Sequence, residues 1–489
     1  MKRLITNSAI GNGAHDPHAW SPCAGNRHPR ITVHNLGSLL VLVMLICTVL
    51  SGVAVTQTST WALGAANWNA PGAWTGGDPD GRERSAAINN VAGQAETTLN
   101  ISPVIVNLSV GRSTVPAVLK MNASEILTLT GKGKMTANIA GRVLATGATQ
   151  NFIYLSDPDG GGTFVLSNRG ELVVDAGSEL NIVGGDFANY NDSIPALVGG
   201  NYILKGTLYV EDLGPVHQNL ARITLSGANA QLRGGRGFGG EPGNALSSLR
   251  TNGKVFGGGA LLKLESGATL SLDGILGNYE VIRIDARSTL NVKGGYDQWQ
   301  SGWTEINGNL NTGGAVDFHK DPNDPKRILW TGSGSINGTR ITDETRGRPG
   351  TFPSQRKNPS DGISSDSGEA QLSPEPSYLT VNCDYEQTSS GVLEIDMNSS
   401  GYGGLKVNGA VTLLGALEVS LLDGFAPSPT DEYVILVAQD GIVGGFSNAP
   451  PGGTVSVVGG GTFRVNYFVL PNGSTTVTLS DYSPSLSTP

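Results

Sequence analysis

Short stretches in which apolar and polar residues alternate recur along the chain, and two of them follow each other closely. Residues 261–274 have the sequence LLKLESGATLSLDG, and residues 281–294 have the sequence VIRIDARSTLNVKG. Each stretch predicts two β-strands joined by a polar turn, because residues at every second position face the same side of a strand. The two copies lie twenty residues apart, so the pattern places Leu262 next to Ile282.

Three further stretches have the same pattern, at 119–131, 172–184 and, less regularly, 223–234. A strand–turn–strand unit of about twenty residues is typical of one coil of a parallel β-solenoid, in which equivalent strands pair about 4.8 Å apart. One coil cannot bury its apolar stripe, but stacked coils form a continuous apolar column. A β-sandwich also consists of short strands, but its strands would not recur in register after twenty residues. The pattern therefore predicts an all-β protein: a parallel β-helix (solenoid) with a C-terminal β segment.

The N-terminal part has a different pattern. Residues 36–55 form an apolar run, and Arg27 and Arg30 precede it. A basic segment followed by an apolar run is typical of a secretory signal, with small residues near Gly52 as a cleavage site. The run is also just long enough to cross a bilayer. We therefore expect residues 1–55 to be a signal peptide or a signal anchor, with membrane contact only through residues 36–55 if they are not cleaved.

A second break in the pattern comes later in the chain. Residues 345–377 are rich in proline, serine and charged residues without periodicity, which is typical of an extended loop or linker. We expect proteases to cut this segment first, at Arg346, Arg348, Arg356 or Lys357. The predicted order is a β-helix with an N-terminal cap at 56–344, this linker, C-terminal β-helix coils and cap at 378–482, and a disordered tail at 483–489.

The composition agrees with many short strands and tight turns. Glycine accounts for 70 of the 489 residues, about twice its usual share, and it supplies the left-handed backbone conformations that turns need. The formal net charge is −9, which disfavours nucleic acid as a partner because acidic surfaces repel phosphates. Cys23 and Cys47 precede the predicted cleavage site, so cleavage would leave Cys383 without a disulfide partner. We expect an inert, packed thiol there.

Three parts of the chain resemble the passenger regions of bacterial autotransporter-type β-helix proteins. The stretch LTVNCDYEQTSSGVLEIDM at 379–397, continued by 405–425, is similar to the passenger phrase LTVxGxYxQ followed by G-x-L-x-[IL]. The stretch DEYVILVAQDGIVGGFS at 431–447 is similar to the closing segment, and the tryptophan-containing stretch at 67–81 resembles the opening segment of secreted bacterial β-helix proteins. The resemblance implies a right-handed β-helix outside the cell and carries over no catalytic residue. Cys383 stands where the family phrase usually has glycine.

Charged residues of both signs lie on the outer side of the matched strands. Arg283, Asp285 and Arg287 follow the alternation and should share one outer face. Lys263 and Glu265 would lie beside the first two in the preceding coil. Basic and acidic groups on adjacent coils are how β-helix polysaccharide lyases neutralise a uronate and abstract its proton. The alternatives are sugar binding and a surface lattice of ion pairs, each pair worth about 0–1 kcal/mol, and we favour the lattice.

Aromatic residues follow this charged face. Tyr296, Trp299 and Trp303 lie close together in the sequence, and Trp330 lies further on. Exposed, they would form a platform on which sugar rings stack. Buried, they would fill the interior of a coil, and we favour burial.

Other motifs with known chemistry are incomplete. The sequence DPDG occurs at 78–81 and at 157–160, and its carboxylates are ligands that calcium accepts. The twelfth positions counted from each first Asp hold Asn89 and Asn168 instead of glutamate, so we expect turns. The glycine-rich 234–240 lacks the Lys-Ser/Thr that a phosphate-binding loop needs. The two histidines after residue 55 are too scattered for a zinc site. We therefore expect no cofactor.

These patterns predict a secreted or cell-surface bacterial protein with a structural or adhesive role and no catalysis. Its expected partners are polysaccharides or other components of the cell envelope. A polysaccharide-active, lyase-like enzyme and a carbohydrate-binding protein are the alternatives. No long amphipathic barrel-forming region follows Ser447, so we expect export by a route other than autotransport.

Overall fold

The computed structural model is all-β, as the pattern predicts, apart from one 3₁₀ helix (η2, Ala245–Ser248) in the described part of the chain. Residues 56–489 form one compact unit. The predicted signal segment at 1–55 lies outside the described residues. These are 57–89, 95–112, 116–122, 124–130, 133–138, 141–148, 150–155, 162–167, 169–238, 242–254, 259–299, 301–320, 328–350 and 375–485.

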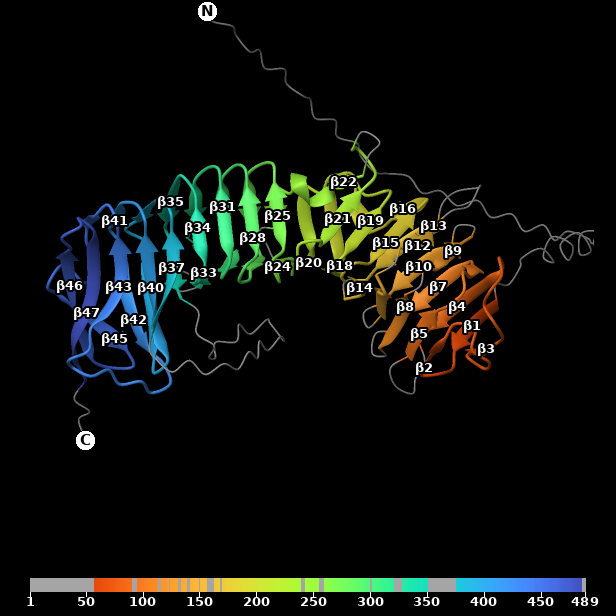
Figure 1. Cartoon of the computed structure of the whole chain (residues 1–489), viewed down its shortest axis with the longest axis horizontal. Coiled ribbons are helices and arrows are strands. Elements are labelled where there is room, and N and C mark those ends of the chain that lie inside the picture. Colours follow the sequence, from red (N-terminus) through yellow and green to blue (C-terminus); the bar gives the residue numbers. More distant parts are fainter. Residues whose placement is uncertain are drawn as a thin grey trace, which may run out of the picture. The chain divides into compact units, whose positions relative to one another are not determined.

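In the first half of this unit, most strands pair with the third strand before and the third strand after them, so the chain returns repeatedly to the same sheet (Figure 1). One seven-stranded sheet contains β3 (Trp74–Thr75), β1 (Gln57–Trp61), β4 (Arg84–Ile88), β7 (Asn107–Val110), β10 (Lys134–Ala137), β13 (Gly162–Leu166) and β16 (Gly185–Phe187). A second contains β6 (Val104–Ile105), β9 (Ile126–Leu129), β12 (Gln150–Tyr154), β15 (Glu179–Val183), β19 (Thr207–Val210), β21 (Gln231–Gly234) and β22 (Gly243–Asn244). Only β3 and β22 pair antiparallel within these two sheets.

All other strands belong to one continuous sheet. Its first parallel row is β2 (Ala65–Asn67), β5 (Ala95–Leu99), β8 (Ala117–Met121), β11 (Gly141–Ala145), β14 (Glu171–Val174), β18 (Ala196–Leu204) and β20 (Gln218–Ser226). The short β17 (Tyr190–Asn191) pairs antiparallel with β18.

Three parallel rows continue after β20, and from β23 through β42 each strand pairs with the third strand after it. The first row is β24 (Leu261–Glu265), β27 (Val281–Ile284), β30 (Trp303–Ile306), β33 (Ile328–Gly332), β36 (Arg346–Pro349), β39 (Val392–Asn398), β42 (Ala416–Leu421) and β45 (Thr454–Val458). The second is β25 (Thr269–Leu272), β28 (Thr289–Val292), β31 (Asn309–Thr312), β34 (Ser335–Asn337), β37 (Glu375–Val381), β40 (Gly401–Val407) and β43 (Tyr433–Ala438). The third is β23 (Thr251–Asn252), β26 (Leu276–Asn278), β29 (Tyr296–Gln298), β32 (Val316–Phe318), β35 (Arg340–Asp343), β38 (Asp384–Gln387), β41 (Val411–Leu413) and β44 (Ile442–Gly444).

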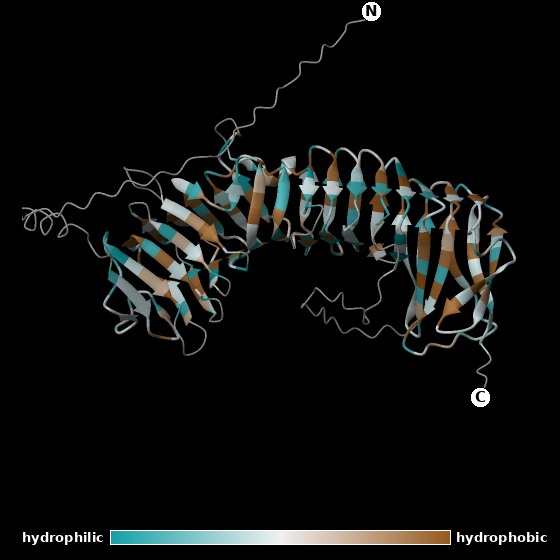
Figure 2. Ribbon diagram, turned by 180° about the vertical axis from the view of Figure 1, so that it is seen from behind, coloured by the Kyte–Doolittle hydropathy of each residue, from teal (hydrophilic) through white to brown (hydrophobic). Residues whose placement is uncertain are grey.

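The register between β24 and β27 is the one that the twenty-residue spacing predicts. Leu262 pairs with Ile282 and Leu264 with Ile284, and all four side chains are fully buried. Lys263 lies between them on the opposite, partly exposed face. Hydrophobic and hydrophilic residues accordingly alternate along many strands (Figure 2). Burial of the inward residues in every repeat forms the continuous apolar core of this unit.

Asparagine side chains link successive repeats both inside and outside the core. The buried Asn219 donates from Nδ2 to Oδ1 of Asn252 at 2.9 Å, and Asn252 donates to Asn278 at the same distance. On the outer side, a second series runs through Asn291, Asn311, Asn337, Asn382 and Asn408, and each member after Asn291 donates to the one before it. Such a ladder aligns each repeat on the one before it.

The two ends of the predicted linker at 345–377 are strands, which corrects that prediction. Arg346 and Arg348 lie in β36, and β36 pairs with β33 and β39. Arg346 Nη1 lies 2.7 Å from Glu418 Oε2, and Arg348 Nη2 lies 2.5 Å from Glu394 Oε1. The sequence suggested a solvated segment because these residues are charged, but their partners come from later repeats. Both arginines are therefore held in the folded unit and are poor protease sites, and residues 351–374 lie outside the described part.

The two ends of the unit differ from its middle. At the N-terminal end the indole rings of Trp61 and Trp68 pack against Trp74. The ring centroids of Trp61 and Trp68 lie 5.0 and 4.7 Å, respectively, from that of Trp74. At the C-terminal end β46 (Thr462–Val469) and β47 (Thr475–Ser483) form an antiparallel hairpin, and β47 pairs with β43. Antiparallel strands at an end cover the backbone groups that a parallel row would leave open.

Candidate functional site

Lys263 and Arg283, the basic residues of β24 and β27, belong to two separate ion-pair groups, and Lys263 is the centre of the first. Its Nζ lies 2.6 Å from Glu265 Oε2 and 3.4 Å from Asp285 Oδ2. Partial burial lowers the pKa of Lys263, but the hydrogen bond to Glu265 and the charge of Asp285 raise that pKa by more, so it lies above its ordinary value. The ammonium group is therefore charged and bound to two carboxylates of the protein.

Arg283 belongs to the second group, although it pairs in register with Lys263. Its Nε lies 3.3 Å from Glu305 Oε2 in the following repeat, and its guanidinium carbon lies 5.1 Å from the centre of the Trp303 ring. Burial raises the pKa of Glu305, and the charge of Arg283 opposes that shift. Lys263 and Arg283 are thus engaged by different carboxylates, and the indole of Trp303 packs against the guanidinium of Arg283.

Arg287 does not share this face, which corrects the expectation that it continues the alternation. Strand β27 ends at Ile284, and Ser288 N donates to Asp285 O at 3.0 Å to close a turn. Arg287 lies in that turn with a φ of 69°, in the left-handed region, and it is exposed. A turn interrupts the period of two on which the prediction depended.

The aromatic residues do not form one platform either. Tyr296 is fully buried inside the unit, with its hydroxyl 2.6 Å from Thr304 Oγ1, so it is not available to a ligand. Trp330 is buried as well, in agreement with the expectation of burial. Trp299 is 36% exposed, and Trp303 lies half-buried on the outer face. The aromatic residues that are close in the sequence lie on different elements: Tyr296 on β29, Trp299 just after it and Trp303 on β30.

A stack of rings that sequence reasoning missed lies along the ends of β26, β29 and β32. The Trp299 ring stacks on Tyr279 at 6.1 Å and on His319 at 4.4 Å between centroids. These residues are twenty positions apart, which is the signal that could have revealed them. Because Tyr279 and His319 both stack on the Trp299 ring, the faces of this ring are occupied by side chains of the protein. Asp297 on β29 pairs in register with Asp317 on β32. Burial raises the pKa of Asp297, and the charge of Asp317 raises it further.

The first DPDG motif forms a turn, as expected. Asp80 N donates to Asp78 Oδ1 at 3.0 Å, and Val104 N donates to Asp80 Oδ1 at 2.9 Å, so both carboxylates serve the backbone. The second copy, at 157–160, lies outside the described residues. Among the residues that the structure does describe, no group of three or more His, Cys, Asp or Glu side chains is placed to hold a metal ion. Cys383 is half-buried, and burial raises the pKa of its thiol.

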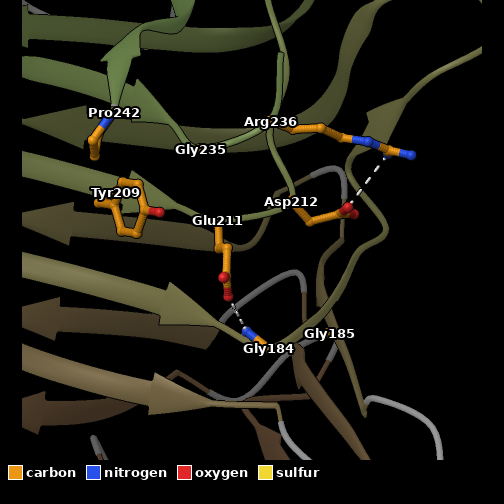
Figure 3. Close-up of a pocket in the computed structure, with 8 residues that line it drawn as sticks. All are labelled: Gly184, Gly185, Tyr209, Glu211, Asp212, Gly235, Arg236 and Pro242. Carbon is orange, nitrogen blue, oxygen red and sulfur yellow. Dashed lines mark hydrogen bonds and ion pairs between the residues drawn. The ribbon is translucent and has the colours of Figure 1, made fainter. Parts of the chain in front are cut away.

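A pocket of about 540 Å³ lies where three neighbouring parallel strands end (Figure 3). Gly184, Glu211 and Gly235 directly follow the aligned strands β15, β19 and β21. Arg236 and Pro242, which lie between β21 and its antiparallel partner β22, also line the pocket. The lining consists of Gly184, Gly185, Tyr209, Glu211, Asp212, Gly235, Arg236 and Pro242. The sequence of the glycine-rich 234–240 suggested only an incomplete phosphate-binding loop, because nothing local indicates the partners of these residues.

The carboxylates of this pocket point to different partners (Figure 3). Glu211 Oε2 accepts a hydrogen bond of 2.7 Å from Gly184 N. Asp212 Oδ1 lies 3.3 Å from Arg236 Nη1, and the same guanidinium pairs with Asp192. Burial raises the pKa of Asp212, while hydrogen bonding to the Phe187 N–H and the charge of Arg236 oppose that shift. The pocket therefore offers carboxylate acceptors, one bound guanidinium and a phenol.

Comparison of the chain with protein-family models, with curated proteins and with solved structures gave no match. Within the described residues, no helix has the length and apolar character needed to cross a membrane, and residues 36–55 are not among them.

Proposed function

We propose that this protein is a right-handed parallel β-helix that is secreted or displayed on the bacterial cell surface, with a structural or adhesive role and no catalysis. The observation that carries the proposal is the repeated parallel pairing of every third strand, from β24 through β45. A crossover between parallel strands of one sheet is right-handed in almost all proteins. Stacked coils form a stable scaffold whose outer residues are free to serve binding.

The charged face on β24 and β27 supports a structural role. In a lyase, the basic groups must be free to receive the substrate carboxylate. Here Lys263 already binds Glu265 and Asp285, and Arg283 binds Glu305. A substrate would have to displace carboxylates that the fold supplies.

Secretion is supported by the sequence. The apolar run at 36–55 follows two arginines, as in export signals. After residue 55 the chain has one cysteine, Cys383, and few charged residues. The stretch at 379–397 resembles the passenger regions of exported bacterial proteins.

Two measurements test the proposal: the location of the protein in the bacterial cell, and the adhesion of cells from which the gene has been deleted. We expect mass spectrometry of the extracellular or envelope fraction to find a mature N-terminus near residue 55, and deletion of the gene to reduce cell adhesion. Recovery of the full chain from the cytoplasm would contradict the proposal, and unchanged adhesion after deletion would contradict its adhesive form.

The lyase alternative has its own assay. A lyase would release unsaturated products from an acidic polysaccharide, detected by ultraviolet absorbance. We expect no such absorbance from the wild type. Release that is lost when Arg283→Ser and Asp285→Asn are combined, in a protein that still folds, would establish the enzyme instead.

A further inference from the structure

The pocket of Figure 3 has one apolar side, formed by Tyr209 and Pro242. Tyr209 lies on β19 next to Arg233 of β21 in the sheet register, and both side chains are partly exposed. A Cβ atom at Gly235 would lie 2.7 Å from the Tyr209 hydroxyl oxygen. Only glycine at this position therefore leaves the phenol where it is. An aromatic ring beside a proline provides a flat apolar surface for a ring-shaped ligand.

The charges around the pocket disfavour an anionic ligand. Glu211 and Asp212 line it, and Asp186 and Asp192 are close enough to affect the titration of Asp212. Arg236 is the single basic residue of the lining, and it is already paired with two of these carboxylates. A phosphate, sulfate or uronate would therefore meet a negative field.

The geometry also disfavours an inorganic cation. A metal ion needs several oxygen ligands that converge on one point. Glu211 turns toward Gly184, whereas Asp212 turns toward Arg236, in the opposite part of the view (Figure 3). Their oxygens therefore act as separate hydrogen-bond acceptors.

We propose that this pocket binds a neutral carbohydrate: a sugar ring that stacks on Tyr209 while its hydroxyl groups donate to Glu211 and Asp212 and accept from Arg236. Sugar hydroxyls are both donors and acceptors, and the ring has apolar C–H faces, so a neutral sugar matches each part of the lining. The volume lies in the usual range of small-molecule sites. The inference rests on the proposed adhesive role and specifies its partner.

The experiment measures binding of the purified mature protein to an array of neutral, sialylated and uronate-containing oligosaccharides. A second arm uses the neutral polysaccharide fraction from the envelope of the producing bacterium, which distinguishes a foreign surface from the cell's own. Calorimetry with spermidine tests for a cationic ligand. The variants are Tyr209→Ala and Glu211→Gln. Their matched controls are Tyr154→Ala and Glu179→Gln, which change a tyrosine and a glutamate on the same sheet outside the pocket.

We expect binding to neutral sugars in at least one arm, a loss of about tenfold or more in each pocket variant, and no change in the controls. If Tyr209→Ala does not fold, as judged by circular dichroism, Tyr209→Leu, which keeps an apolar side chain but removes the ring face, and Glu211→Gln provide the same comparison. Binding to acidic glycans or spermidine alone, equal binding by pocket and control variants, or no binding would overturn the inference. Adhesion that depends on the gene without neutral-sugar binding would overturn only this inference and leave the proposed function standing.

Discussion

Replacement of Asp343 with alanine should destabilise the unit strongly, because this carboxylate organises a polar cluster inside the core. Asp343 lies on β35 and is completely buried. It accepts hydrogen bonds from Thr345 N at 3.0 Å, Thr345 Oγ1 at 2.7 Å, Tyr385 Oη at 2.8 Å and Trp330 Nε1 at 3.2 Å. All four partners are donors, and Tyr385 and Trp330 are themselves buried.

The expected loss follows from the donors that would remain without an acceptor. The side chains of Trp330 and Tyr385 are almost completely buried, so without the carboxylate the Trp330 N–H and the Tyr385 O–H would lose their acceptor, and each buried unsatisfied donor costs about 1–3 kcal/mol. We therefore expect Asp343→Ala to lower the free energy of unfolding by about 2–6 kcal/mol from these two groups alone. Tyr385→Phe in the Asp343→Ala background removes one stranded hydroxyl, so this second change should be neutral or stabilising there, although it costs stability in the wild type.

The assay is native-state hydrogen exchange of the amides in β33, β35 and β38, because long repeat proteins do not unfold in one cooperative step. The opening free energy of these strands should fall in Asp343→Ala and recover in the double variant. A loss below about 1 kcal/mol, or strictly additive effects of the two changes, would refute the view that Asp343 holds its neighbours by hydrogen bonds.

Two further predictions concern the register and the acidic pair. Ile284→Asp places an unpaired charge in the core and should cost about 3–5 kcal/mol, whereas the outward change Lys263→Ser should cost about 1 kcal/mol or less; equal losses in thermal unfolding would contradict the register. Burial and the charge of Asp317 raise the pKa of Asp297, so the folded protein favours the protonated carboxyl group. Asp297 therefore adds to the stability of the fold below the ordinary pKa of aspartate, and this contribution is lost as the pH rises through the pKa of Asp297 in the folded protein. Asp297→Asn should therefore melt at a higher temperature than the wild type at pH 7 but not at pH 3, and a variant that melts lower at pH 7 would show that the ionised carboxylate is stabilising.

The repeat could be predicted from the sequence because it depends on spacing alone. Two matched copies were enough to place Leu262 against Ile282, since each strand turns alternate residues inward. The same rule failed at Arg287, where a turn replaces the strand. It did not reveal the stack on Trp299 either, because the aromatic residues were grouped by nearness in the sequence instead of by the twenty-residue interval.

The candidate pocket and the charged strand β36 could not be predicted, because their partners are distant in the chain. Arg236 pairs with Asp192, which is 44 residues earlier. Arg346 pairs with Glu394, which is 48 residues later. A charged residue without its partner suggests a solvated loop, and only the folded unit shows that two neighbouring repeats bring the opposite charges together.

The asparagine ladders explain why this fold does not depend on the apolar stripe alone. Leucine and isoleucine at alternate positions would still face inward if one repeat slipped by two residues against the next, so the apolar stripe leaves more than one register open. An asparagine amide both donates and accepts, and the chain Asn219–Asn252–Asn278 forms only when these positions are aligned. A slip would leave buried amide groups without partners, at about 1–3 kcal/mol each. The polar residues of the interior therefore select one register among those that the apolar residues allow.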